Sequence, residues 1–223
     1  MPRPLRIEIP DGIYHIINRA NHRSIIFAKS HDYSAFEDII FEGLKKYSVQ
    51  IYAYVIMPNH WHLVLSPKKE GELARYLHWI TTTHVHRWNE VRRLTGNGHL
   101  YQGRYRSFLV ESGEYFLTLC RYVEGNPVRA SLAASAEKWR WSSLWHRQNE
   151  SKQVIKFADW PIDVPRGYID FVNKAFATED KFIKDIALSM SLGVPYGSLK
   201  WKKKLPEDVC PKSRPRGRPV KVE

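Results

Sequence analysis

Two apolar runs that meet at a turn constrain the fold of this chain more than any other feature. Residues 52–57 and 61–65 are each as long as a β-strand and rich in Val, Ile, Leu and Tyr, and Pro58-Asn59 is a turn pair. The pattern predicts a β-hairpin. Because alternate residues of a strand share a face at a spacing of roughly 6.5 Å, His60 and His62 can present two imidazoles to one metal ion. Two histidines on a strand are also common as ordinary packed or surface residues, and the spacing alone leaves that alternative open.

A second His-x-His pair, His84 and His86, lies in a segment with helical periodicity. In a helix, residues i and i+2 point in directions about 200° apart, so these two side chains diverge. We predict no shared ligand role for them.

The periodicity of the rest of the chain predicts the element order β-α-β-β-α-β-α. Beyond the hairpin, strands are expected at residues 12–18 and 104–110, and helices at 32–47, 71–93 and 112–125. Ser112 is the expected N-cap of the last helix and Pro127 is expected to end it. This order predicts an α+β, ferredoxin-like split βαβ fold: a four-stranded antiparallel sheet with helices on one face.

The balance of charge indicates a polyanionic partner. The net charge is +12 and the sequence pI is about 9.7. Aromatic residues make up 13% of the chain, which favours base stacking on nucleic acid over a membrane surface. The two cysteines, 90 positions apart, fit a reducing compartment, and no apolar run suggests a signal peptide or membrane span. We therefore expect a soluble cytoplasmic protein, associated with the nucleoid if bacterial.

A tyrosine and an amide share one face near the end of the expected helix 112–125. Tyr122 and Asn126 are separated by four residues. A phenol, with a reference pKa near 10, is a poor nucleophile until a neighbouring cation favours the phenolate. Tyr115, seven residues earlier on the same face, is the alternative nucleophile.

Five motifs occur in an order that resembles the single-tyrosine HUH transposases, and within them the REP-associated tyrosine transposases. The resemblance covers residues 10–147. The motifs are Tyr14-His-Ile-Ile-Asn-Arg, Met57-Pro-Asn-His-Trp-His, Gly98-His-Leu-Tyr-Gln-Gly-Arg104, Arg121-Tyr-Val-Glu-Gly-Asn-Pro-Val-Arg-Ala130 and Trp139-Arg-Trp-Ser-Ser143.

This resemblance implies a role for each residue that matches the family motifs. His60, His62 and Asn126 would bind a divalent cation, and Tyr122 would attack single-stranded DNA at hairpin-forming repeats. The products would be a 5′-phosphotyrosyl link and a free 3′-hydroxyl. By ligand type alone zinc, manganese or magnesium would fit, but phosphoryl transfer and the resemblance together favour Mg²⁺ or Mn²⁺.

Basic and amide side chains near the motifs are candidates for contacts to DNA, although each could be ordinary surface charge. They are Arg19, Gln102, Arg104, Arg106 and Arg129.

The composition changes beyond Arg147. We expect a catalytic domain at residues 1–147, a helical extension at 148–199 and a basic, disordered tail at 200–223, which holds nine Lys or Arg against three acids. Arg216 to Pro219 resemble the core of an AT-hook, in which Arg214, Arg216 and Arg218 would contact a narrow minor groove. A nonspecific basic tail is the alternative.

The resulting hypothesis is a metal-dependent DNA endonuclease and strand transferase, as a monomer or a homodimer. A protein that binds DNA hairpins without cutting them is the main alternative, and a metal-free RNA-binding domain is a more distant one.

Overall fold

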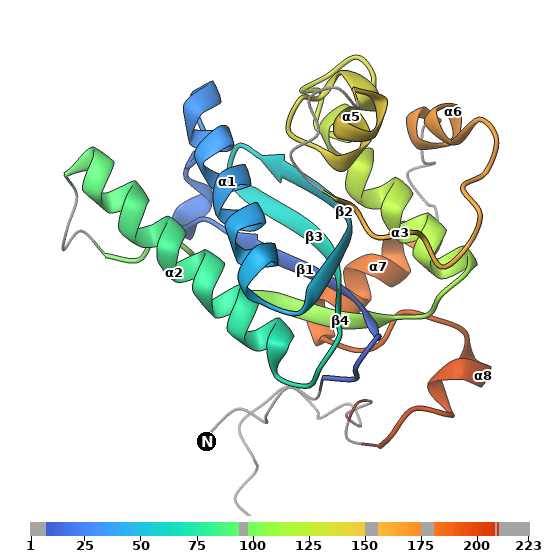
Figure 1. The fold of residues 1–223 in the computed structure, drawn as a ribbon. Coiled ribbons are helices and arrows are strands. Elements are labelled where there is room, and N and C mark those ends of the chain that lie inside the picture. Colours follow the sequence, from blue (N-terminus) through green and yellow to red (C-terminus); the bar gives the residue numbers. More distant parts are fainter. Residues whose placement is uncertain (1–7, 94–97, 150–155, 175–180, 208, 210–223) are drawn as a thin grey trace, which may run out of the picture.

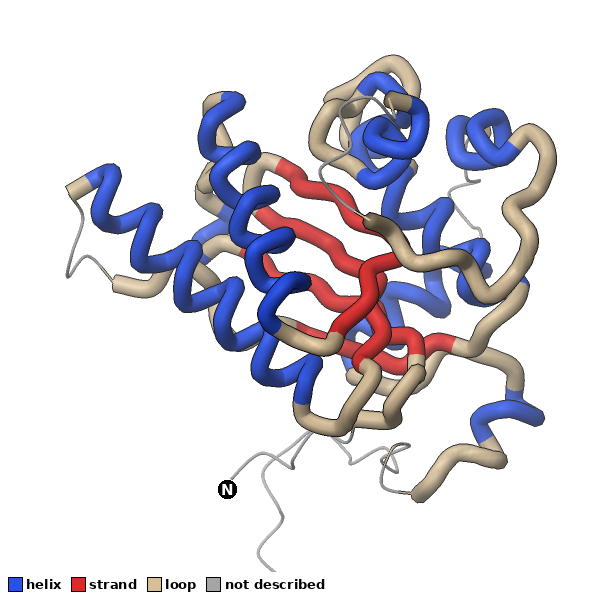
Figure 2. The backbone as a smooth tube through the Cα atoms, in the orientation of Figure 1, coloured by secondary structure: helices blue, strands red, loops and turns tan. Residues whose placement is uncertain are grey.

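Four antiparallel strands form the centre of the molecule. The computed structural model describes residues 8–93, 98–149, 156–174, 181–207 and 209. The strands are β1 (Ile13–Arg19), β2 (Val49–Met57), β3 (His60–Pro67) and β4 (Arg106–Val110), in the spatial order β2-β3-β1-β4 (Figures 1 and 2). The predicted four-stranded sheet of the ferredoxin-like type is confirmed, including the hairpin that turns at Pro58-Asn59.

The two longest helices cover the first face of the sheet. They are α1 (Ser30–Lys46) and α2 (Glu72–Arg92). Phe36, Ile39, Ile40 and Leu44 recur at helical spacing along α1. The first three are fully buried in this core together with Leu77 and Ile80 of α2, and the half-buried Leu44 packs against it. Helical spacing of apolar residues thus placed both helices correctly.

The opposite face is also covered, which corrects the expectation of helices on one face. Figure 1 shows α3 (Glu114–Glu124), α5 (Ser143–Gln148) and α7 (Lys181–Leu192) across the sheet from α1 and α2. Phe116 and Leu119 of α3 pack there against Val55 and Val64 of the hairpin strands. The physical reason is visible in the sequence of β2, which is apolar at nearly every position and therefore needs cover on both faces.

A short helix, α4 (Asn126–Arg129), follows α3 after Gly125. The expectation that Pro127 ends the preceding helix is wrong, because proline lies in the first turn of α4, where its missing N–H costs nothing. The expected cap is also different: Gly113, and not Ser112, is the N-cap residue of α3, without a side-chain cap bond.

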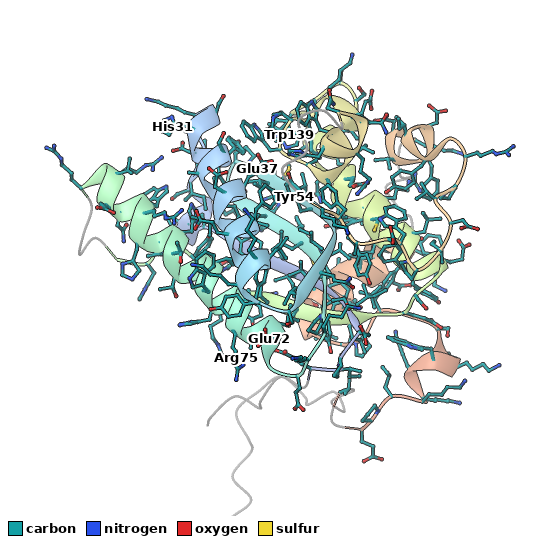
Figure 3. The ribbon with its side chains drawn as sticks, in the orientation of Figure 1. His31, Glu37, Tyr54, Glu72, Arg75 and Trp139 are labelled. Atoms are coloured by element: carbon teal, nitrogen blue, oxygen red, sulfur yellow. The ribbon has the colours of Figure 1, made fainter. Side chains whose placement is uncertain are left out.

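A buried carboxylate joins α1 to the hairpin and to the segment around Trp139 (Figure 3). Glu37 accepts a hydrogen bond of 2.6 Å from the Tyr54 hydroxyl and lies within 3.3 Å of Arg140 and 3.2 Å of His146. Two one-turn segments also occur in the described chain, η1 (Asn21–Arg23) and η2 (Ala136–Lys138).

The C-terminal part returns to the sheet. Tyr196 pairs with β4 through its backbone, donating to Leu109 and accepting from Glu111. It follows α6 (Tyr168–Asn173) and α7, and α8 (Leu199–Lys202) comes after it. The division at residues 147/148 and 199/200 stays a prediction; α5 and α8 cross these two positions.

The expected disorder of residues 200–223 does not hold for residues 200–207. Trp201 and Leu205 pack against the core between the sheet and helices α1 and α2, because this basic stretch also carries large apolar side chains. Arg214, Arg216 and Arg218 lie outside the described residues. No helix in the described part is long and apolar enough to cross a membrane.

Candidate active site

The two histidines of the hairpin lie together at the start of β3. His60 is opposite Met57 and His62 is opposite Val55 in the β2–β3 register. Their ring centroids are 5.1 Å apart with planes at 78°. His62 is buried and faces α3, and His60 is half-buried near the turn. The predicted common face is confirmed, because strand alternation places i and i+2 on one side.

Each of these histidines has one ring nitrogen engaged. Nδ1 of His60 donates to the Asn59 side-chain oxygen at 2.6 Å, and Nδ1 of His62 lies 2.8 Å from Nε2 of His15. Within the described part of the chain, Nε2 of each histidine has no hydrogen-bond partner. These two atoms are therefore the candidates for binding an ion.

Burial keeps both imidazoles neutral. The pKa of His60 is lowered to about 4, mainly by burial and further by the charge of Arg19. The pKa of His62 is lowered well below its ordinary value, again mainly by burial. A neutral imidazole is the form that binds a metal, so both side chains are ready as ligands at physiological pH.

Tyr122 is the tyrosine of α3 that reaches this pair. Its ring contacts His62 edge to face, with centroids 6.0 Å apart. Tyr115 instead packs against Tyr196 with centroids 5.0 Å apart. Burial raises the pKa of Tyr122, and the positive charges of Arg129 and Arg19 oppose that rise. Of the two tyrosines weighed from the sequence, the structure brings Tyr122 to the histidines.

Asn126 turns its amide nitrogen toward α3. Nδ2 donates to the carbonyl oxygens of Tyr122 and Val123 at 3.1 and 3.3 Å. Its side-chain oxygen accepts no hydrogen bond from the described residues. Among those residues there is also no cluster of three His, Cys, Asp or Glu that could hold a metal. By ligand type, two imidazoles and one amide oxygen would fit zinc, manganese or magnesium.

Arg129 lies beside the phenol. Its guanidinium carbon is 4.4 Å from the centroid of the Tyr122 ring, and Nη2 donates to the Tyr122 carbonyl oxygen. The sequence suggested Arg129 as a contact to DNA. Its positive charge also acts on the phenol, because it opposes the rise in the pKa of Tyr122 that burial causes.

The other four DNA contacts predicted near the family motifs converge on one hollow. Arg19, Gln102, Arg104 and Arg106 line a space of about 510 Å³ together with Ala187, Met190 and Ser191 of α7. No acidic residue is among the described residues that line it. Because Arg19 is opposite His60 in the β1–β3 register, the hollow lies next to the histidine pair. Uncompensated guanidinium groups at this place suit a phosphodiester backbone.

Two features of the site were not found from the sequence. The contribution of α7 to the hollow depends on where residues 181–192 dock, which helical periodicity does not encode. His15 was visible only as part of a motif, although alternation along β1 places it on the face of Ile13 and Ile17.

The chain matches the family model described as "Transposase IS200 like" over residues 9–126, more than half of its length. It belongs to the IS200-like transposase family. The matched region of this IS200-like transposase contains His60, His62, Tyr122 and Asn126, whereas Arg129 and α7 follow it. Membership of the family implies an enzyme that cleaves DNA.

Solved structures with a similar fold include a REP-associated tyrosine transposase bound to a REP hairpin. That protein is 16% identical, with a TM-score of 0.55, and the match covers 80% of this chain and 100% of the other. A putative transposase from Deinococcus radiodurans R1 is 16% identical, with a TM-score of 0.41 and coverage of 60% and 100%. The tRNA(His) guanylyltransferase of Saccharomyces cerevisiae is 10% identical, with a TM-score of 0.44 and coverage of 93% and 86%. No curated protein sequence matches this IS200-like transposase.

Proposed function

We propose that this IS200-like transposase cuts and rejoins single-stranded DNA through a covalent bond to Tyr122. The observation that carries the proposal is the contact between Tyr122 and His62, whose ring centroids are 6.0 Å apart. This contact supports Tyr122 over Tyr115 as the nucleophile, because His62 is one of the proposed cation ligands. No water is needed as the attacking group.

His60, His62 and Asn126 would hold a divalent cation. Zinc, manganese or magnesium would fit this ligand set, and phosphoryl transfer favours Mg²⁺ or Mn²⁺ among them. When bound, such an ion supplies positive charge that polarises the target phosphate and favours the phenolate. Burial lowers the pKa of His60 and of His62, which favours the neutral imidazole that binds a cation. The Asn59 side chain additionally orients His60, because it holds Nδ1 and leaves Nε2 facing away from the bond.

Tyr122 performs the transfer itself. Its hydroxyl oxygen attacks the scissile phosphorus, the bond between phosphorus and the 3′-oxygen breaks, and a 5′-phosphotyrosyl link remains. The phenolic proton leaves the tyrosine and the departing 3′-oxygen takes up a proton. Arg129, 4.4 Å from the ring centroid, stabilises negative charge on the phenol before the attack.

The substrate strand would follow the basic hollow that adjoins His60. Arg19, Arg104 and Arg106 are placed for phosphate contacts, and Gln102 for a base edge. The shared fold with a protein bound to a REP hairpin supports a hairpin-forming DNA repeat as the substrate class. Unpaired nucleotides beside such a hairpin would be the segment that reaches the site.

The test is incubation of the full chain with single-stranded hairpin repeats and Mg²⁺ or Mn²⁺, followed by a denaturing gel. A covalent protein–DNA adduct that needs the ion supports the proposal. Tight binding of the hairpin with no adduct under any ion would instead support the alternative of a non-catalytic hairpin-binding protein. Cleavage with a free 5′-phosphate and no adduct would indicate a hydrolase.

A further inference from the structure

His15 and His62 meet through their ring nitrogens on the face of the sheet that α3 covers. Nε2 of His15 lies 2.8 Å from Nδ1 of His62, and the ring planes are inclined by 23°. Atoms of stacked rings stay roughly 3.5 Å or more apart, so the two imidazoles meet edge to edge in a hydrogen bond. Both side chains are buried, at 0% and 1% exposure, which shields the bond from solvent.

The sheet holds His15 in this place. β1 lies between β3 and β4, and His15 is opposite Val64 while Ile17 is opposite His62. The two histidines are therefore diagonal neighbours on adjacent strands, within reach of each other's side chains. Phe108 of β4, which is opposite His15, packs against its ring with centroids 4.9 Å apart.

The hydrogen bond has two possible directions, because a neutral imidazole carries its proton on one nitrogen. If Nδ1–H of His62 donates to His15, then Nε2 of His62 keeps its lone pair and can bind an ion. If Nε2–H of His15 donates instead, His62 carries its proton on Nε2 and cannot bind an ion through that atom. The direction of this one bond therefore decides whether His62 can be a ligand.

Burial alone does not select the direction. In the described part of the chain, Nδ1 of His15 has no hydrogen-bond partner. It is an unpaired donor in the first arrangement and an unpaired acceptor in the second. Binding of a cation at Nε2 of His62 selects the first arrangement, provided that His15 offers an acceptor.

We infer that His15 is a positioning residue that accepts a hydrogen bond from Nδ1–H of His62 and so keeps Nε2 of His62 available to a divalent cation. This inference rests on the proposed function, since it concerns the same ion. It gives a task to a fully buried side chain that would itself lie outside the set of ion ligands. Partners of this kind typically change metal affinity by about 10- to 100-fold when they are removed.

The experiment compares ion binding by the full chain without DNA, followed through the Mn²⁺ electron paramagnetic resonance signal. His15→Phe keeps a ring in place and removes the acceptor, and it should weaken Mn²⁺ binding by about 10- to 100-fold. His15→Gln offers an amide oxygen and should recover most of the affinity. Phe108→Leu, which loosens the packing on His15 but leaves its nitrogens, is the matched control and should change affinity by less than about threefold, well below the range expected for the acceptor.

Nitrogen-15 shifts of the histidines in the Mg²⁺-bound wild-type chain give a second measurement that does not depend on how the variants fold. The expected result is a proton on Nδ1 of His62. A proton on Nε2 of His62 in the ion-bound protein would overturn the inference, as would a His15→Phe variant that folds and binds Mn²⁺ like the wild type. The second of these results would leave the proposed function standing. The first would also remove His62 from the proposed set of ion ligands, and a wild-type chain that binds no ion would overturn both the inference and the proposed function.

Discussion

The guanidinium carbon of Arg129 lies 4.4 Å from the centroid of the Tyr122 ring, seven residues along the chain. This contact joins the last turn of α3 to the end of α4 and places a fixed positive charge beside the proposed nucleophile. Arg129 opposes the rise in the pKa of Tyr122 that burial causes.

Replacing Arg129 should therefore slow the formation of the covalent adduct. For Arg129→Gln we expect a decrease of about tenfold near neutral pH, equivalent to about 1.4 kcal/mol. Without the charge of Arg129 the pKa of Tyr122 is higher, so a higher pH is needed to form the phenolate. Raising the pH should therefore recover part of the rate of the variant. Arg129→Lys keeps the charge and should lose less. If Arg129→Gln instead lowers DNA affinity and the salt slope at an unchanged adduct rate, Arg129 is a phosphate contact as first expected.

Removing the hydroxyl of Tyr122 should abolish the adduct and leave DNA binding intact. Tyr122→Phe keeps the ring that contacts His62 and Arg129, so the loss of packing is small. A denaturing gel measures the adduct. Tyr115→Phe is the matched control and should react nearly normally, since Tyr115 packs against Tyr196. The reverse outcome for the two variants would reassign the nucleophile.

His60→Ala should eliminate cleavage with little change in affinity for the hairpin. The imidazole is an ion ligand in the proposal, whereas the hollow lined by arginines positions the strand. His86→Ala is the control, because His86 is an exposed histidine of α2, and it should leave cleavage unchanged. Full cleavage by His60→Ala, or by the wild type in EDTA, would remove the ion from the mechanism.

The metal-free protein should lose stability as the pH falls below 6.5. Burial lowers the pKa of His15 and of His84 to about 3 in the folded state, below the unfolded value of 6.5. Between these values the unfolded chain binds more protons, so the free energy of unfolding decreases as the pH decreases. Urea denaturation should show a flat profile above pH 7. Each such histidine should add about 1.4 kcal/mol per pH unit to the slope below 6.5.

The His84→Phe variant tests the origin of this slope. His84 stacks on Phe27 and bonds to the Tyr101 hydroxyl, so the variant keeps an aromatic ring but loses a titrating group. Its slope between pH 6.5 and 5 should be smaller than that of the wild type. An unchanged slope would assign the pH dependence to other groups.

Deleting residues 210–223 should weaken binding to duplex or hairpin DNA and leave the covalent chemistry unchanged. The segment carries five Lys or Arg and one acid, and each lost phosphate contact should lower the log–log salt slope by about one unit. The deletion starts at 210 because Trp201 and Leu205 pack against the core that α1 and α2 cover. An Arg216→Ala variant with equal losses on A·T-rich and G·C-rich flanks would favour the nonspecific tail over the AT-hook.

Local patterns predicted the parts of the site that depend on neighbours in sequence. Strand alternation placed His60 and His62 on one face, and helical spacing placed Tyr122 beside Asn126. Contacts between distant segments were not predictable in this way, because periodicity does not specify which helix covers which face. The bond between His15 and His62 spans 47 positions, and α3 was expected on the wrong side of the sheet.

The basic hollow is built by two parts of the chain that lie far apart in the sequence. One side comes from the strand and loop residues beside His60, and the other comes from Ala187, Met190 and Ser191 of α7, beyond the region matched by the family. Substitutions on α7 change the shape and polarity of the hollow without touching His60, His62 or Tyr122. In the proposed function this hollow receives the substrate strand, so α7 is the place to exchange side chains when a new DNA target is wanted and the residues around Tyr122 are to be kept.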